Sequence, residues 1–159
     1  MCRAMASAPE SPIVAFRQDE AGDWIADLAC GHSQHVRHRP PMEVREWVVT
    51  EEGRRGRIGA RLPCRLCRMP RLPAAVTEYK RTSIFDASTI PSGLRKRHTT
   101  KAGVWGEIVV LEGRVLYVIE DEEDASFILR PGVPGAIAPE APHHVEPYED
   151  ARFFVRFLR

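Results

Sequence analysis

The sequence predicts a mainly β protein of two units, a small α+β module that binds zinc followed by an all-β domain. Short apolar runs separated by Gly and Pro recur through the second half, which is typical of sandwiches and barrels. Three of the four Cys and three of the six His fall between positions 30 and 67. Formal charge also differs: residues 1–73 carry 12 Arg against 9 acidic residues, and residues 74–159 carry 11 basic against 13 acidic residues. These contrasts indicate two units with different roles.

The composition is that of a globular protein without a membrane anchor. The chain has 159 residues, 43% of them hydrophobic and 28% charged. No apolar run approaches the ~20 residues of a membrane span, and the first residues lack the apolar core of a secretory signal. We therefore expect a cytoplasmic protein, in a reducing compartment where cysteines bind metal rather than form disulfides.

Prolines and composition set the expected boundaries. Small and polar residues predict a disordered tail over 1–11. Pro70 and Pro73 then mark a linker. We expect a zinc-binding module over 12–72, the linker over 73–77 and the all-β domain over 78–159.

The first unit shows two strand signals and one helix signal. Residues 13–16 and 24–29 read as strands joined by a polar turn. Residues 42–50 fit either a strand or a helical turn. Thr50, which precedes Glu51 and Glu52, has the pattern of a helix N-cap followed by acids in the first turn.

The second unit reads as a series of short strands. Two of them, 107–111 and 114–120, flank Glu112-Gly113, a pair typical of a two-residue hairpin turn. An acidic turn is expected at 121–124. The remaining strands are expected at 79–85, 126–130, 136–138 and 152–158.

The cysteine spacing in the first unit predicts a structural zinc site. Cys64-x-x-Cys67 has the spacing of a zinc knuckle, and Cys30 supplies a third thiolate. His32 is the first choice for the fourth ligand, and His35 is the alternative. A domain of about 60 residues buries little apolar surface, so a bound metal would compensate for a small core.

An arginine-rich run surrounds the second cysteine pair. Such a run beside zinc could contact a phosphate backbone. It lacks interleaved aromatic residues for base stacking, which favours a solvated face. A nucleic-acid partner is therefore the weaker alternative. The run consists of Arg54, Arg55, Arg57, Arg61, Arg65, Arg68 and Arg71.

The second unit contains a second set of chemically capable residues. His98 lies in a basic, loop-like segment, and His143 and His144 lie in PEAPHHVEP. If the strands close into a barrel, His98 and His143 could meet at one site; otherwise they are hydrogen-bonded core residues. Arg95, Arg97 and Lys101 add positive charge nearby, which would favour an anionic ligand.

The second half resembles a known family. Gly93, His98, Thr100, Glu107 and Gly113 resemble a degenerate first cupin motif, with Thr100 where a second His usually stands. The segment 139–146 resembles the second cupin motif. More narrowly, residues 78–159 are similar to the TehB-like family of small cupin domains, through LRKRHTTKAGVWG, VVLEGRVLY and EAPHHVEP. Residues 12–70 resemble a small bacterial domain family of unknown function, marked by CGHSQHVRHRPP and CRLC.

The resemblance implies a fold and a site. The fold would be a cupin, a jelly-roll β-barrel. His98 and His143 would hold a second divalent metal, with Glu107 as a further ligand. Thr100 and Lys101 would contact a small molecule or an oxyanion. A homodimer is expected from the resemblance alone.

Three functions follow from this comparison. The first is a metal-binding cupin protein that binds a small anionic ligand in a stress response, such as resistance to tellurite or to oxidative or nitrosative stress. The second is a metal-dependent cupin oxygenase or isomerase, so the sequence leaves open whether the chain is an enzyme. The third is a nucleic-acid-binding regulator acting through the arginine-rich module. Methyl transfer is not expected, because the chain ends at Arg159, where the family's methyltransferase domain would follow.

Overall fold

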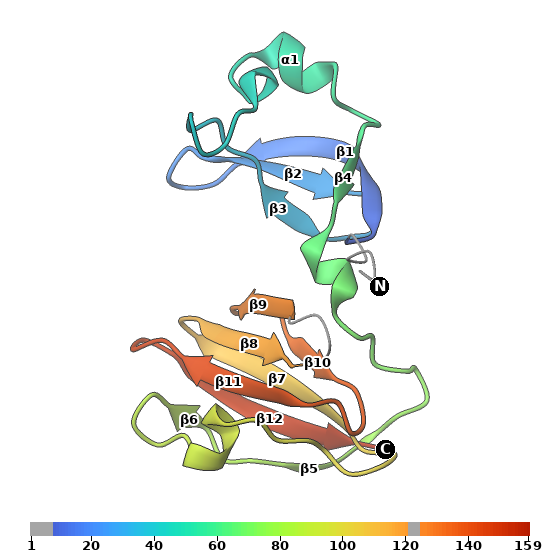
Figure 1. The fold of residues 1–159 in the computed structure, drawn as a ribbon, viewed down its shortest axis with the longest axis vertical. Coiled ribbons are helices and arrows are strands. Elements are labelled where there is room, and N and C mark those ends of the chain that lie inside the picture. Colours follow the sequence, from blue (N-terminus) through green and yellow to red (C-terminus); the bar gives the residue numbers. More distant parts are fainter. Residues whose placement is uncertain (1–7, 121–124) are drawn as a thin grey trace, which may run out of the picture. The chain divides into compact units, whose positions relative to one another are not determined.

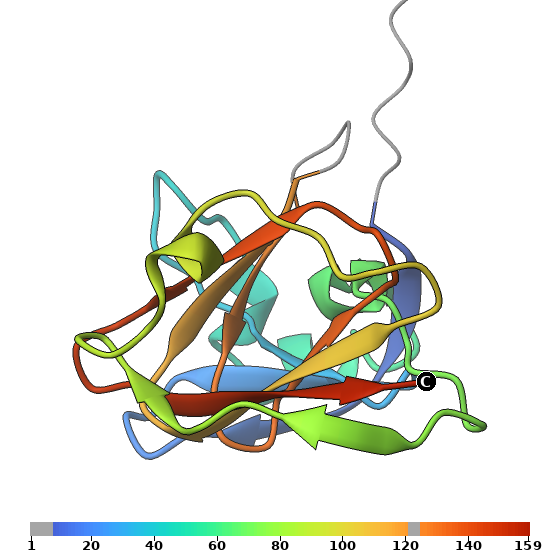
Figure 2. The ribbon, with the colours of Figure 1, turned by 90° about the horizontal axis from the view of Figure 1, so that it is seen from below.

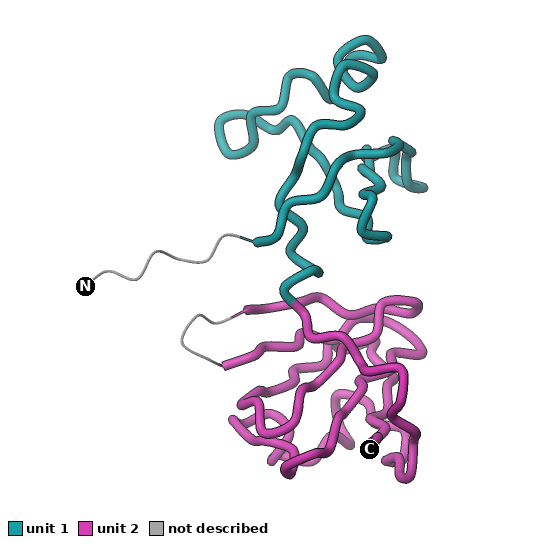
Figure 3. The backbone as a smooth tube through the Cα atoms, turned by 90° about the vertical axis from the view of Figure 1, so that its right-hand side faces the viewer, with its two compact units in different colours: residues 1–68 teal, residues 69–159 magenta. Residues whose placement is uncertain are grey.

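A computed structural model describes residues 8–120 and 125–159. The chain divides into two compact units, one ending at Arg68 and the other beginning at Met69 (Figure 3). The boundary lies a few residues before the expected linker. Thr77, inside that linker, exchanges two backbone hydrogen bonds with Arg159 and so belongs to the second unit. No helix among the described residues is long and apolar enough to cross a membrane.

The first unit is a small antiparallel sheet with short helices around it. Its strands lie in the order β3-β2-β1-β4 (Figure 1). The core combines Ile13, Leu28, Val36 and Val48 with the buried Cys64. The elements are β1 (Glu10–Gln18), β2 (Trp24–Leu28), β3 (Ser33–His35), η1 (Glu46–Val48), α1 (Glu51–Arg55), β4 (Arg61–Pro63) and η2 (Arg65–Arg68).

In this unit the structure confirms one local prediction and decides between two open alternatives. The Thr50 side chain accepts a hydrogen bond from the Gly53 N–H, so Thr50 caps α1 as expected. Residues 42–50 contain a helical turn, η1, rather than a strand. The expected disordered tail is too long, because β1 already begins at Glu10 and the Pro9 carbonyl accepts from the Cys64 N–H. Residues 1–7 of that tail lie outside the described part of the chain.

The second unit consists of two antiparallel sheets. One has the order β10-β7-β12-β5, with β6 also paired to β12, and the other has the order β11-β8-β9. In Figure 2, β12 and β5 lie side by side in the first sheet. The elements are β5 (Glu78–Arg81), β6 (Phe85–Asp86), η3 (Ser92–Arg95), β7 (Trp105–Glu112), β8 (Val115–Ile119), β9 (Ala125–Leu129), β10 (Gly135–Ile137), β11 (His143–Pro147) and β12 (Arg152–Leu158).

Alternating side chains from both sheets form the core of this unit. Ile108 and Val110 of β7 are buried, as are Tyr117 of β8 and Phe153 and Val155 of β12. The predicted alternation of β12 is confirmed for Phe153 and Val155. A register shift between Phe157 and Leu158 then turns Leu158 inward as well.

The predicted hairpin at Glu112-Gly113 is wrong. β7 and β8 are adjacent in the sequence but belong to different sheets. β11 and β9 pair along both edges of β8, from Val115 to Ile119, so β8 has no edge left for β7. β7 pairs instead with β12 along its whole length and with β10 at Gly106–Ile108. Gly113 has φ +67°, and a Cβ there would lie 2.4 Å from the Asp150 carbonyl oxygen. Glycine, which has no Cβ, therefore fits the close connection between the two sheets, where other residues would be strained.

The structure gives a two-sheet antiparallel unit, and the finer prediction of a cupin jelly roll is not supported by it. The acidic turn expected at 121–124 lies outside the described residues. The other strands occur within a few residues of their expected positions.

Candidate functional site

Four predicted ligands meet in the first unit. Cys30 and His32 flank Gly31 in the turn after β2, whereas Cys64 directly precedes η2 and Cys67 lies within it. Their ligand atoms all lie within 4.8 Å of one another. His32 Nδ1 lies 3.5 Å from Cys30 Sγ and 3.4 Å from both Cys64 Sγ and Cys67 Sγ. Among the described residues, this is the only group of three or more side chains positioned to hold a metal ion.

These distances match a tetrahedral zinc site. Zn–S bonds of about 2.3 Å and a Zn–N bond of about 2.0 Å, at a tetrahedral angle, place sulfur and nitrogen about 3.5 Å apart. Hydrogen bonding does not explain the arrangement, because a single imidazole nitrogen has at most one proton to share among three sulfurs. The group can therefore hold one tetrahedral metal ion.

The other two histidines of this unit, His35 and His38, make contacts outside the cysteine group. His35 Nε2 lies 2.8 Å from Asp19 Oδ2, and its ring is not part of the cysteine group. His38 Nδ1 accepts a hydrogen bond from the Arg45 backbone N–H. The geometry therefore favours His32 over His35 as the fourth ligand.

The thiols respond differently to their surroundings. Burial raises the pKa of the Cys64 thiol. Burial also acts to raise the pKa of Cys30, but hydrogen bonds from the His32 backbone N–H and the Ser11 side chain outweigh it and lower that pKa. A divalent cation at the centre would favour the thiolate at all three positions, because thiolates are the ligands that zinc binds.

Several side chains of the arginine-rich run make contacts with other residues of the first unit. Arg54 stacks over the Trp24 ring at 3.6 Å and donates to the Val48 carbonyl. Arg57 lies over Trp47, and Arg55 pairs with Glu51. These contacts use the guanidinium groups to cover aromatic and helical surface.

In the second unit, His98 and His143 come together. Each donates its backbone N–H to the other's carbonyl, at 3.0 and 2.9 Å, and the ring centroids are 4.1 Å apart. His143 is only 1% exposed, at the start of β11. His144 points to the other face, where its Nδ1 lies 3.2 Å from Glu120 Oε1.

Hydrogen bonds fix the tautomer of both rings. His98 Nδ1 contacts the Lys96 carbonyl and His143 Nδ1 contacts the Ala141 carbonyl, each at 2.8 Å. A carbonyl only accepts, so both Nδ1 atoms carry the proton. Burial, opposed by the Ala141 hydrogen bond and assisted by His98, lowers the pKa of His143 to about 4. His143 is therefore neutral at pH 7, with Nε2 as a hydrogen-bond acceptor.

Both rings line a pocket of about 650 Å³ inside the second unit. Its wall combines β5 and β12 from one sheet, β11 from the other, and the loop before β7. The lining residues are Tyr79, Lys80, Thr82, Leu94, His98, Thr99, Thr100, Lys101, Ala102, Val104, Ile137, His143, Val145, Val155, Phe157 and Arg159. The volume lies within the range of small-molecule sites.

Thr100 and Lys101 lie on the wall of this pocket, as the sequence suggested. The Thr100 hydroxyl donates to the Val104 carbonyl at 2.8 Å and accepts from the Glu140 N–H at 3.3 Å. It therefore holds the loop in shape and does not complete a ligand set with the two histidines. The Lys101 side chain is exposed at the pocket.

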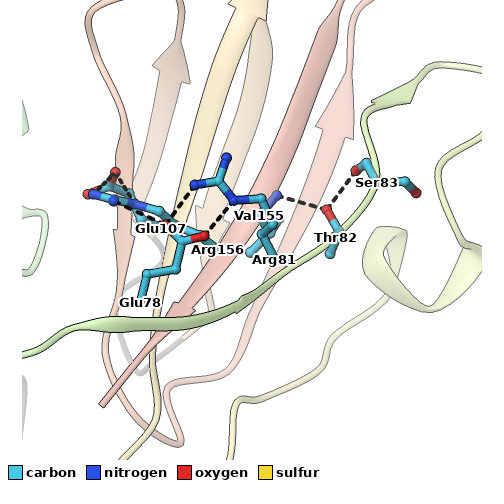
Figure 4. A network of polar contacts seen from close by, with 7 residues as sticks. All are labelled: Glu78, Arg81, Thr82, Ser83, Glu107, Val155 and Arg156. Carbon is cyan, nitrogen blue, oxygen red and sulfur yellow. Dashed lines mark hydrogen bonds and ion pairs between the residues drawn. The ribbon is translucent and has the colours of Figure 1, made fainter.

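Glu107 is not part of the pocket. It lies on the outer face of β7, where its Oε1 is 2.9 Å from Arg156 Nη2. Glu78 and Arg81 of β5 extend this network across the same face of the sheet (Figure 4). The expected role of Glu107 as a ligand beside the histidines therefore has no geometric basis. No group of three metal ligands forms around His98 and His143 in the described residues.

The sequence analysis missed Lys80 and Arg159 as pocket residues. Lys80 pairs with Phe157 across β5 and β12, and cross-strand partners share a face of the sheet. Phe157 lines the pocket, so Lys80 faces it too. Arg159 lies over the Tyr79 ring at 4.3 Å. Only the register between distant strands reveals these positions.

Two family models match the chain. Residues 80–155 match the TehB-like domain, and residues 14–71 match a family described as a protein of unknown function (DUF3565). The boundary between the matches agrees with the two units of the structure.

One curated protein matches part of the chain. The chain is 31% identical over 77 residues to the probable S-adenosyl-L-methionine-dependent methyltransferase TehB of Haemophilus influenzae (strain 10810). This match covers 45% of the chain and 27% of that protein, so the chain spans about a quarter of the relative's length.

Two crystal structures are also similar. That of TehB from Haemophilus influenzae has 26% identity and a TM-score of 0.49, over 52% of this chain and 31% of the other. That of an Escherichia coli (strain K12) structural-genomics protein has 26% identity and a TM-score of 0.51, over 57% of this chain and 97% of the other.

These matches correct the expected function. The family found is TehB-like, and its curated relative is named as an S-adenosylmethionine-dependent methyltransferase. The predicted metal-binding cupin function is therefore wrong, and so is the cupin oxygenase interpretation. The nucleic-acid regulator was an interpretation of the first unit, which these matches do not test, and it stays a prediction. The likeness to the TehB-like family itself is confirmed.

Proposed function

We propose that the TehB-like unit is the small-molecule-binding part of a TehB-type methyl-transfer system, and that it holds the methyl acceptor. The pocket beside His98 and His143 carries this proposal, because it falls almost wholly within the segment that matches the TehB-like domain. The relative's name supplies the reaction, methyl transfer from S-adenosylmethionine.

The histidine pair suits a methyl acceptor. Acceptors such as hydroxyls, thiols and amines bear a proton that leaves during methylation. A neutral imidazole with Nδ1 protonated offers Nε2 as the acceptor for such a proton. His143 is in this state, and both His98 and His143 donate Nδ1–H to a backbone carbonyl and line the pocket.

The described residues do not fit S-adenosylmethionine itself. Nucleoside cofactors are commonly held at the ends of parallel strands, by glycine-rich turns and helix N-termini. All strand pairs in the described residues are antiparallel, and α1 has five residues. No Asp or Glu side chain of the described residues lines the pocket to bind ribose hydroxyls or an ammonium group. We therefore assign acceptor binding to this unit and derive no methyl-transfer step within it.

A ligand-observed NMR screen of the full chain tests this proposal. Small molecules with hydroxyl, thiol or amine groups should bind at one site. Their binding should be lost in Ala102→Trp, which fills the pocket, and retained in Ala75→Trp, an exposed alanine that does not line it. Molecules that bind should then be methylated by a TehB methyltransferase with S-adenosylmethionine. Binding that Ala102→Trp does not affect would refute the assignment of the pocket.

For the first unit, we propose that Cys30, His32, Cys64 and Cys67 bind a structural zinc ion. The spacing of the four ligand atoms supports this metal, and Cys64 lies within the small core. Replacing zinc with Co²⁺ tests the geometry. A tetrahedral site with three thiolates should give intense visible absorption and a sulfur-to-cobalt charge-transfer band, whereas weak octahedral bands would contradict it. Because the three thiols form a ligand group, we also propose a reducing, cytoplasmic setting.

A further inference from the structure

We propose that the pocket of the TehB-like unit selects an organic anion with an apolar body and a hydroxyl or amine donor, and discriminates against bare inorganic oxyanions. This inference rests on the proposed function and names the class of acceptor. Three independent features of the pocket support it, namely its charge, its size and the state of its histidines.

The charge of the lining has one sign. Lys80, Lys101 and Arg159 line the pocket, and no Asp or Glu is among its lining residues in the described part of the chain. The acidic side chains closest along β5 and β7, Glu78 and Glu107, lie on the opposite face with Arg156. A concave site with an excess of positively charged side chains attracts an anion, because its walls concentrate the field.

The size of the pocket exceeds what an inorganic anion needs. Three or four oxygen-sized atoms displace about 100 Å³, taking about 30 Å³ for each water-sized atom. The pocket holds about 650 Å³. Much of its wall is apolar, through Leu94, Ile137, Val145 and Val155 with the ring of Phe157. An organic body in contact with this wall would gain from the burial of apolar surface, which an oxyanion cannot do.

The histidine side chains favour a ligand that carries a hydrogen-bond donor. Their Nδ1 protons are taken by the Lys96 and Ala141 carbonyls, so Nε2 is the remaining polar atom of each ring. His143 is neutral at pH 7, so its Nε2 accepts a hydrogen bond and does not attract an oxygen anion. The ligand therefore needs a hydroxyl or amine group in addition to its anionic group, which is the group that methylation would modify.

Four small probes separate these requirements. 4-Hydroxybenzoate has the anion, the ring and the hydroxyl. 4-Hydroxybenzamide lacks the charge, benzoate lacks the hydroxyl, and sulfate lacks the organic body. Each is titrated at constant ionic strength into the uniformly ¹⁵N-labelled full chain. The amide signals of residues 99–104 and of His143 report on the pocket.

We expect 4-hydroxybenzoate to shift these signals saturably, with at least tenfold tighter binding than 4-hydroxybenzamide and clearly tighter binding than benzoate. Sulfate should give no saturable shift. The double substitution Lys80→Met with Lys101→Met should weaken 4-hydroxybenzoate at least tenfold and leave 4-hydroxybenzamide unchanged. Lys96→Met is the matched control, since Lys96 does not line the pocket, and should bind as the natural sequence does. The dispersion of each spectrum shows that the variant is folded.

The contrary results are distinct from one another. Equal binding of 4-hydroxybenzamide and 4-hydroxybenzoate would overturn the anionic class and leave the small-molecule function standing. Sulfate binding as tightly as 4-hydroxybenzoate would identify an inorganic oxyanion site instead. If no probe shifts the pocket signals at millimolar concentration, both this inference and the proposed binding function fail.

Discussion

His143 lies with its ring 4.1 Å from that of His98, and the two residues are joined by a pair of backbone hydrogen bonds. The bridge ties the start of β11 to the loop before β7, so the two rings are held together by the main chain. The surroundings of His143 also include Tyr117, Glu120 and His144. Because the His143 ring is fixed and buried, protonating it in the folded state is unfavourable, and this affects the stability of the second unit in acid.

Acid should weaken the second unit through His143. Its pKa is about 4 in the folded state and about 6.5 in an unfolded chain. Between these values the unfolded state binds more protons, so the free energy of unfolding falls as the pH drops from about 6.5 to 4 and changes little below that. The full difference corresponds to roughly 3 kcal/mol.

NMR can measure this effect directly. Hydrogen exchange at the amides of β8 and β11 follows the second unit alone, so acid release of metal from the first unit does not contribute. His143→Gln should remove most of the pH dependence in this window. A ring of His143 that titrates near 6.5 in the folded protein would contradict the prediction.

Metal binding should depend on His32 and not on His35. His32→Ala removes one of four ligands, and the first unit should lose its zinc and much of its structure, because metal binding and folding are coupled in small zinc domains. His35→Ala removes only the contact with Asp19 and should keep one zinc per chain. Elemental mass spectrometry and circular dichroism measure both. Equal zinc loss in the two variants would show that the site differs from the one described here.

Local signals were enough to find the group of three cysteines and one histidine that could hold a metal ion. The Cys-x-x-Cys spacing and the Cys-Gly-His segment are read within a few residues, and turns bring their ligand atoms to fixed positions. The choice between His32 and His35 needed the structure. It depends on how the turn at Gly31 and the strand β3 direct each ring, and the two residues are equally plausible by spacing.

Longer-range features could not be read from the sequence. The Glu112-Gly113 pair has the same local sequence pattern in a hairpin and in a connection between sheets. The pairing of β8 with β11 and β9 on its two edges excludes the hairpin. Lys80 enters the pocket only because β5 pairs with β12 in a particular register. The short cupin-like motifs misled for a similar reason. Thr100 and Glu107 matched by spacing, yet their partners in the structure are Val104 and Arg156.

Gly113 should tolerate substitution poorly. Gly113→Ala places a side chain at positive φ and drives its Cβ against the Asp150 backbone. We expect a loss of about 2–4 kcal/mol in the free energy of unfolding, measured with urea. Gly132→Ala is the control, because Gly132 also has positive φ but nothing within 4 Å of the added Cβ. It should cost only about 1–2 kcal/mol, the strain of the left-handed backbone. Equal losses would mean that the approach of Asp150 to Gly113 is not tight in solution.

In the second unit, a polar network lies on the outer face of the sheet β10-β7-β12-β5. We expect it to stabilise this unit mainly through Arg156. Arg156 holds Glu107, whose side chain is 13% exposed, and also reaches Glu78. Arg156→Leu would leave the Glu107 carboxylate largely buried without its cation, and we expect a loss of about 1–3 kcal/mol in the free energy of unfolding.

Arg152 provides a matched control on the same strand. It pairs with Glu112, and both side chains are half exposed or more. Arg152→Leu should change stability by less than about 1 kcal/mol, because water already solvates that pair. The double substitution Arg156→Leu with Glu107→Leu should recover part of the loss, since it removes the buried charge together with its partner. A double variant no more stable than Arg156→Leu alone would show that the loss comes from packing of the arginine side chain over the sheet, and not from the unpaired carboxylate.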